Sequence, residues 1–246
     1  MTTDLIIALT AAMVATAFLS GVFGMAGGLV LMGGLLVVLP LPIAMSLHAV
    51  TQMASNGWRG VLWIGYVRWR AASYFLIGCA IAFAAWTVWQ YVPSKPVAFI
   101  LLGLSPFVVR LAPTKLKPNP ERLGDGIICG SACMSLMLLA GVSGPLIDTY
   151  FLGGKLDRRE IVATKAVCQI VSHGAKFLYF GSLVSGAAAL DPTMVALAIV
   201  ASIVGTSLAR PILDRLTETQ YRSWATQIIT AIALVYLIQG SYLLLT

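Results

Sequence analysis

The sequence predicts an all-α polytopic membrane protein made of two inverted repeats, each a re-entrant helical hairpin followed by three transmembrane helices. Three observations lead to this fold class. The 246 residues are 59% hydrophobic and 10% charged, with a mean hydropathy of +0.91, whereas soluble domains carry about 25% charged residues. The chain also matches itself at a fixed offset, and its basic connections change position between the two halves.

Apolar runs of helix length recur along the whole chain. A bilayer core of about 30 Å requires about 20 apolar residues per helix, whereas the strands of a membrane barrel would alternate in segments of ~10 residues. Because Met1–Asp4 holds no basic residue, we expect the first run to be a helix and not a cleaved signal. The runs are Leu5–Phe23, Ile43–Ile64, Ala71–Tyr91, Val97–Val109, Gly126–Ala140, Ile161–Gly181, Met194–Ala209 and Trp224–Leu245.

Charge, cysteine content and missing motifs exclude several other classes. The formal net charge of +7 lies mostly in short connections, where the positive-inside rule expects it, so nucleic-acid binding is not predicted. Cys79, Cys129, Cys133 and Cys168 fall in apolar segments without metal-site spacing, and we expect them to be small buried residues. The sequence has no nucleotide-binding P-loop and no motif of a hydrolytic centre. We therefore expect no enzyme, no cofactor and no metal.

Two halves of the chain match without gaps at an offset of 117 residues. "GMAG" (24–27) lies over "GVSG" (141–144), and "HAVTQMASNGWR" lies over "KAVCQIVSHGAK". Matched Gln, Ser and Gly pairs are informative in a composition where Leu and Ala match by chance. Repeats of this kind are common in transporters. The match predicts a first repeat (1–112, hairpin break at 24–28), a cytoplasmic linker (113–122) and a second repeat (123–246, hairpin break at 141–145).

Basic residues lie in different connections of the two repeats. Val67–Arg70 is basic, but its equivalent Val184–Ala187 has no charge. Gly153–Glu160 is basic, but its equivalent Leu36–Ile43 has none. Under the positive-inside rule this exchange predicts opposite topologies for the two repeats. Because Arg110–Arg122 and Gly153–Glu160 would both be cytoplasmic, the segment between them must enter the membrane and return.

Each predicted break leaves backbone N–H groups that hydrocarbon cannot satisfy. The short second arms begin at Ala26–Gly28 and Ser143–Pro145. A helix N-terminus with free N–H groups and a partial positive charge is a site for anions. The alternative is a tight hairpin whose glycines serve close helix packing. Two breaks at equivalent positions favour the anion site.

The helix after each break carries a stripe of polar residues on one face. Its members are basic groups or neutral donors, which suit an anion better than a cation. For a single Gln the alternative is a helix–helix hydrogen bond, and for Arg59 and Lys176 it is snorkelling to an interface. Asp148 has three open roles: an ion pair with Lys165, a proton carrier, or a favourable charge at its helix start. The stripes are His48, Gln52, Asn56 and Arg59 in the first half, and Lys165, Gln169, His173 and Lys176 in the second.

The breaks and stripes together predict one anion-binding site near mid-membrane. Asp148 is added as the candidate for proton coupling. The predicted binding residues are Gly24, Ala26, Gly27, Gly28, His48, Gln52, Asn56, Arg59, Gly141, Ser143, Gly144, Pro145, Lys165, Gln169, His173 and Lys176.

Two stretches, "GVFGMAGGLVLMGGLLVVLPLP" and "AGVSGPLIDTYFLGGKLDRREIVATKAV", extend the pattern of glycines at both breaks. On these motifs and the two-half plan, essentially the whole chain resembles the sulfite exporter TauE/SafE family of membrane permeases. The resemblance implies outward transport of sulfite, organosulfonates or other sulfur-containing anions. The sequence departs from the family pattern at Met25 and Ala26, where a fuller glycine run is expected. It also departs at His48 and Gln52, where plainer residues are expected. The resemblance points to Gly24, Gly27, Gly28, Gly141, Gly144, Pro145 and the Thr164–Lys165 pair.

These observations predict a secondary transporter that exports small sulfur-containing anions by alternating access around a mid-membrane site. The alternatives are a passive anion channel and a non-transporting membrane scaffold or assembly factor. The expected partners are the small anion and the lipid bilayer, with a homodimer left open. The expected location is the bacterial inner (plasma) membrane, as a multi-pass protein.

Overall fold

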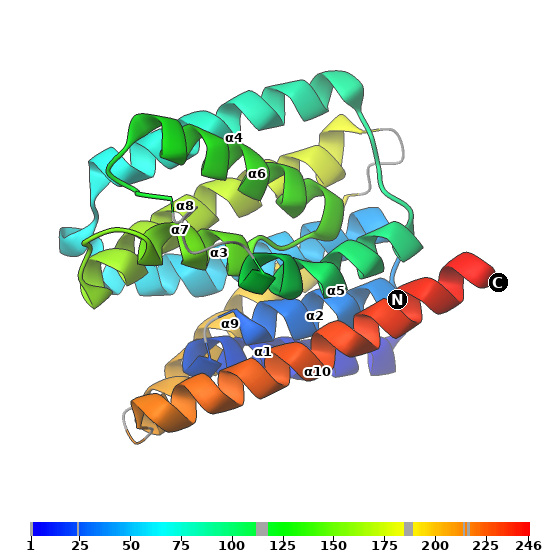
Figure 1. Cartoon of the computed structure of the whole chain (residues 1–246). Coiled ribbons are helices and arrows are strands. Elements are labelled where there is room, and N and C mark those ends of the chain that lie inside the picture. The colour runs from blue at the N-terminus through cyan, green and yellow to red at the C-terminus, as the bar shows by residue number, and fades with distance from the viewer. Residues whose placement is uncertain (1, 24, 112–117, 185–188, 214, 216) are drawn as a thin grey trace.

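The computed structural model describes residues 2–23, 25–111, 118–184, 189–213, 215 and 217–246, and these residues form helices and connections without a β-strand (Figure 1). The all-α prediction is confirmed. Residues 112–117 of the predicted linker lie outside the described residues. The elements are α1 (Thr3–Phe23), α2 (Ala26–Val38), α3 (Leu41–Leu62), the 3₁₀ turn η1 (Ile64–Tyr66), α4 (Trp69–Trp89), α5 (Lys95–Leu111), α6 (Leu123–Ala140), α7 (Gly144–Leu152), α8 (Arg158–Leu178), the π-helical turn η3 (Tyr179–Leu183), α9 (Pro192–Leu213) and α10 (Glu218–Leu245).

Five described helices, α1, α4, α6, α9 and α10, are long and apolar enough to cross a membrane. Helices α3 and α8 have 22 and 21 residues but are more polar, because they carry the two stripes. Helices α2 and α7 have only 13 and 9 residues, and at 1.5 Å per residue they extend about 20 and 14 Å. The first arm of each predicted hairpin is thus as long as a membrane span, and only the second arm is short.

Helices α3 and α8 form the centre of the molecule (Figure 1), between the α4–α6 pair and the α1–α9 pair. They cross in antiparallel directions. His48, near the start of α3, contacts Lys176, near the end of α8. Gly60, near the end of α3, lies against Ala166, near the start of α8. The two polar stripes therefore meet along this crossing.

The outer helix pairs also have defined directions. Helices α5 and α10 are antiparallel, because Gly240 lies against Ile100 whereas Arg110 donates to Thr230. Helices α1 and α9 are parallel, and so are α4 and α6. The contacts that show the parallel pairs are Ala17 with Gly205 and Gly21 with Ala209, and Tyr74 with Gly126 and Trp86 with Ser135.

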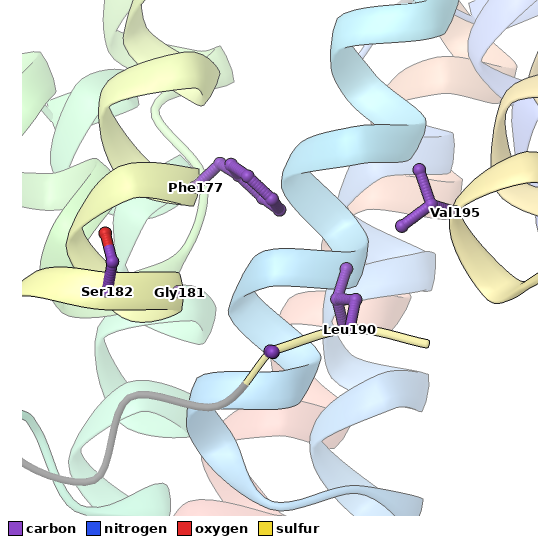
Figure 2. Close-up of a pocket in the computed structure, with 6 residues that line it drawn as sticks. Phe177, Gly181, Ser182, Leu190 and Val195 are labelled. Atoms are coloured by element: carbon purple, nitrogen blue, oxygen red, sulfur yellow. The ribbon is translucent and has the colours of Figure 1, made fainter. Parts of the chain in front are cut away.

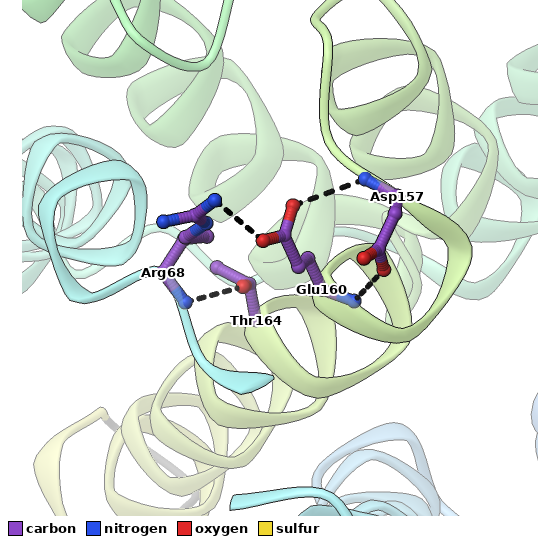
Figure 3. A network of polar contacts seen from close by, with 4 residues as sticks. All are labelled: Arg68, Asp157, Glu160 and Thr164. Atoms are coloured by element: carbon purple, nitrogen blue, oxygen red, sulfur yellow. Dashed lines mark hydrogen bonds and ion pairs between the residues drawn. The ribbon is translucent and has the colours of Figure 1, made fainter. Parts of the chain in front are cut away.

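Three basic connections meet on one face of the molecule. Arg68, between α3 and α4, forms an ion pair of 2.6 Å with Glu160 at the start of α8, and its backbone N–H donates to Thr164 (Figure 3). Glu160 also completes a capping box with Asp157, which fixes where α8 begins. Pro120 of the linker accepts a hydrogen bond from Tyr150. The connections 63–68, 118–122 and 153–157 therefore share a face, which we call the basic face.

The opposite face holds the α4–α5 connection and the described part of the segment between η3 and α9. Tyr179, where α8 passes into η3, donates to the carbonyl of Tyr91 in the α4–α5 connection. Asp191 caps α9 by accepting the Thr193 N–H at 2.7 Å, with Pro192 at the first helical position. This hydrogen bond lowers the pKa of the Asp191 carboxyl.

Close packing of α2 on α1 depends on Gly27. A Cβ atom at this position would lie 1.9 Å from the carbonyl oxygen of Thr16. We expect Gly27→Ala to destabilise the protein by about 1–3 kcal/mol through overpacking. The matched change Gly34→Ala, in the same helix with nothing within 4 Å, gains helix propensity of up to roughly 1 kcal/mol. Melting temperatures of the purified variants in detergent test this, and equal values for both variants would contradict it.

Candidate functional site

The two helix breaks touch near the centre of the molecule. The first follows Phe23, and its predicted residue Gly24 lies outside the described residues. Met25, the N-cap of α2, lies against Gly144, the first residue of α7. Gly141 ends α6 with a φ of +82°, a left-handed cap that favours glycine. The sequence predicts two facing hairpin tips, and the contact between Met25 and Gly144 brings them together.

Lys176 joins the two breaks through hydrogen bonds. Its side chain is fully buried, and its Nζ donates to the Gly141 carbonyl at 2.8 Å and lies 2.7 Å from His48 Nδ1. The other ring nitrogen, His48 Nε2, is 2.9 Å from the Gly28 carbonyl. A carbonyl only accepts, so Nε2 carries the proton and Nδ1 accepts from Lys176. A continuous chain runs from Gly28 through His48 and Lys176 to Gly141.

Lys176 is a buried basic group without a carboxylate partner among the described residues. The ion pairs in that part of the chain are Arg68–Glu160 and Lys165–Asp148. Burying an uncompensated charge is costly, and two polar partners, the Gly141 carbonyl and the His48 imidazole, share the stabilisation here. The buried group of Lys176 and His48, which we call the centre, therefore favours the approach of a negative charge.

Several buried polar atoms around this centre have unused hydrogen-bonding capacity. His173 has a ring centroid 5.5 Å from that of His48, and its Nδ1 is buried without a hydrogen-bond partner in the described structure. The same holds for the hydroxyls of Ser20 and Ser46. A small ligand with several acceptor oxygens could use such groups.

The two glutamines of the stripes flank the centre. Gln52 is 8% exposed, and its amide oxygen would lie 3.3 Å from a Cβ atom at Gly28. Gln169 is half-buried on α8. Among the described residues neither side-chain amide makes a hydrogen bond, so both can donate to a ligand.

Arg59 and Asn56 continue the first stripe toward the basic face. The half-buried Arg59 donates from Nη2 to Asn56 Oδ1 at 2.9 Å. Asn56 in turn donates to the Gln52 carbonyl at 2.9 Å. The guanidinium group is thus turned along α3 toward the centre.

Lys165 and Asp148 form a separate pair between α8 and α7. Their N–O distance is 2.5 Å, and their side chains are 17% and 23% exposed. Of the three roles open to Asp148, the ion pair with Lys165 is the one present in this structure.

The helix N-termini at the breaks offer fewer backbone donors than the sequence suggests. At α7, the Leu146 and Ile147 N–H groups both donate to the Ser143 carbonyl, and Pro145 has no N–H. At α2, Ala26 and Gly27 are buried and packed against α1. Lys176 and His48 instead contact backbone carbonyls, that of Gly141 at the end of α6 and that of Gly28 in the first turn of α2, which the sequence reasoning missed. The sequence does carry a signal for the Gly141 carbonyl. A C-cap glycine marks the end of a helix, where the last carbonyls have no partner within the helix.

The cysteines and one cavity complete the surroundings. All four cysteines are buried and free, as the sequence predicts. A cavity of about 230 Å³ lies between η3 and the start of α9. Figure 2 shows Phe177 and Ser182 on one side of it, with Leu190 and Val195 on the other. Its lining is mainly apolar, and the lining residue Phe177 directly follows Lys176 in the sequence.

The fold and the site define a class of protein: a polytopic helical membrane protein with a buried basic centre between two helix breaks. A family model described as "Sulfite exporter TauE/SafE" matches residues 8–236. The chain therefore belongs to the sulfite exporter TauE/SafE family, a family of membrane transporters for sulfur-containing anions. No curated protein and no solved structure matches the chain.

The hydrogen-bond chain between the breaks makes His48 and Lys176 energetically coupled. We expect His48→Leu to destabilise the protein by roughly 3 kcal/mol, because it removes one partner of a buried basic group. Adding Lys176→Met to that variant should restore most of the loss, since it removes the stranded charge. Thermal unfolding of both single variants and the double variant in detergent gives the coupling free energy. Simple addition of the two single losses would contradict the direct contact.

Proposed function

We propose that this chain is a secondary transporter that exports small sulfur-containing anions, such as sulfite or an organosulfonate, across the bacterial inner membrane. The observation that carries the proposal is Lys176, fully buried between the two breaks without a carboxylate partner among the described residues. Family membership supplies the substrate class.

The chemistry of the centre fits such anions. Sulfite and sulfonate oxygens accept hydrogen bonds, so they require donors and no nearby unpaired acids. Lys176 and the amides of Gln52 and Gln169 supply donors, and Asp148 is neutralised by Lys165. Charge-assisted hydrogen bonds of this kind are stronger than neutral ones.

Alternating access would arise from two inverted repeats that move around the site. Equivalent helices of repeats related by an axis in the membrane plane run antiparallel, whereas an axis along the membrane normal would leave them parallel. The equivalent pairs α3–α8 and α5–α10 are antiparallel, which supports the inverted arrangement. The contact of α1 with α9 also has its counterpart in the contact of α6 with α4.

The basic face supports the orientation in the membrane. Arg68, Arg122 and Lys155 lie in its connections and Arg159 lies in the first turn of α8, and the positive-inside rule assigns such a face to the cytoplasm. In the proposed orientation the substrate enters from this face and leaves by the opposite one.

Reconstitution of the purified protein into liposomes tests the proposed function. We expect flux of ³⁵S-sulfite or a labelled alkyl sulfonate, accelerated by unlabelled substrate on the opposite side, and loss of flux in Lys176→Met. Lys155→Met, which changes an exposed lysine in a connection, is the matched control and should transport normally. A passive channel would conduct without counterflow. Unchanged flux in Lys176→Met, Gln52→Ala and Gln169→Ala would favour a non-transporting scaffold and contradict the proposal.

Proton coupling at Asp148 stays a separate prediction. If Asp148 carries a proton during transport, Asp148→Asn should abolish the acceleration of flux by a pH gradient while leaving counterflow intact, because exchange requires no net proton movement. Flux with and without an imposed gradient measures this. Equal acceleration in the variant and the unmodified protein would assign Asp148 to the ion pair with Lys165 alone.

A further inference from the structure

We infer that the basic face binds the headgroup of an anionic phospholipid at Arg159, beside the aromatic turn η1. The inference concerns the lipid that surrounds the protein and does not depend on the proposed transport function. The ligand is a phospholipid whose headgroup carries a net negative charge on its phosphate, such as phosphatidylglycerol.

Arg159 lies where helix stability alone does not favour a basic residue. It is in the first turn of α8, and the partial positive charge of a helix N-terminus is unfavourable for a cation. The acids beside it have other partners. Asp157 caps the helix by accepting the Glu160 N–H, and Glu160 accepts from the Asp157 N–H and pairs with Arg68. Among the described residues Arg159 therefore has no carboxylate partner.

Aromatic rings hold the Arg159 side chain against η1. Its guanidinium carbon lies 5.8 Å from the centroid of the Trp63 ring and 5.5 Å from that of the Tyr66 ring. Its Nη1 donates to the Tyr66 hydroxyl at 3.1 Å, and the two rings contact each other with centroids 5.8 Å apart. Cation–π contacts of this kind position a guanidinium without neutralising its charge.

This arrangement leaves hydrogen-bond donors at the surface. The side chains of Arg159 and Tyr66 are both exposed. A guanidinium has five N–H donors, and for Arg159 one of them, that to Tyr66, has a partner among the described residues. Because the Tyr66 hydroxyl accepts from Arg159, its own proton is left to donate. A phosphate group with several acceptor oxygens can bind both side chains, and its bonds to the guanidinium are charge-assisted.

Exposed apolar side chains around the same turn indicate a lipid and not a soluble anion. They lie in the last turn of α3, in η1 and at the start of α4, and each is more than half exposed. Tryptophan is typical of the membrane interface, where one end of the ring is apolar and the other is hydrated. Acyl chains can cover this surface while the phosphate of the same molecule reaches Arg159. The residues are Val61, Leu62, Ile64 and Trp69.

The site lies across the junction between the end of α3 and the start of α8. Turn η1 follows α3 directly, and its contacts with Arg159 join it to α8. The contacts of Arg68 with Glu160 and Thr164 join the same connection to the same helix (Figure 3). A headgroup bound to Arg159 and Tyr66 would add a bridge there, and a ligand that binds only the folded protein raises its stability.

Quenching of Trp63 fluorescence by brominated lipid tests the inference. The other five tryptophans are replaced by phenylalanine, and the protein is placed in phosphatidylcholine vesicles with increasing fractions of brominated phosphatidylglycerol or brominated phosphatidylcholine. We expect half-maximal quenching at an about fivefold lower fraction of phosphatidylglycerol. A basic residue near an anionic membrane surface contributes about 1 kcal/mol, which corresponds to this factor.

Matched variants identify the group responsible for the preference. Arg159→Gln should remove the difference between the two lipids, whereas Lys155→Gln, which changes an exposed lysine of the same face, should retain it. The ratio of the two lipids is the readout, because loss of a merely structural contact would change quenching by both lipids alike. Equal quenching by both lipids in the parent chain, or an unchanged ratio in Arg159→Gln, would overturn the inference.

Thermal unfolding in detergent gives a second readout in the chain with its natural tryptophans. Added phosphatidylglycerol should raise the melting temperature of the unmodified protein and of Lys155→Gln more than that of Arg159→Gln. Glycerol phosphate at the same concentration should have no such effect. Equal stabilisation by glycerol phosphate would assign Arg159 to soluble phosphates and overturn the lipid site. Neither experiment measures sulfite flux, so its outcome leaves the transport proposal to its own test.

Discussion

The structure depends on one constraint: a helix that breaks inside a membrane must find partners for its backbone groups within the protein, because hydrocarbon supplies none. Because the chain has two breaks, it must satisfy such backbone groups at two places. Here the Gly141 carbonyl at the end of α6 is satisfied by Lys176, which also bonds to His48, and His48 in turn bonds to the Gly28 carbonyl in the first turn of α2. The same hydrogen bonds that make the breaks tolerable therefore bury a basic group between them. Stability of the fold and the proposed affinity for an anion therefore have a common origin.

This solution determines which helices are polar. Both partners must reach the breaks from helices that pass through the centre, so α3 and α8 carry the ionisable and amide side chains, and the remaining long helices can be almost wholly apolar. The α4–α6 and α1–α9 pairs then cover the polar crossing on either side. Helices α2 and α7 need only be long enough to return from a break, which is why they are short.

The sequence predicted the parts of this arrangement that leave a periodic or compositional trace. Glycines at 27, 28 and 141, the stripes on 48–59 and 165–176 and the matching offset are all visible without coordinates. Helical periodicity assigns a residue to a face but does not set where two helices cross, so the contact of His48 with Lys176 could not be derived. The role of carbonyls was also missed, although Pro145 lacks an N–H and already weakened the case for backbone donors at α7.

The two ends of the α3–α8 crossing hold their lysines in different ways. At one end Lys176 bonds to the neutral imidazole of His48, while at the other end Lys165 forms an ion pair with Asp148. Where the first repeat has His48, the second has Lys165, and the added cation is offset by Asp148, whose own repeat equivalent is the apolar Leu31. Of these two lysines only Lys176 has no carboxylate partner among the described residues, which is why the proposed anion site lies at its end of the crossing and not at that of Lys165.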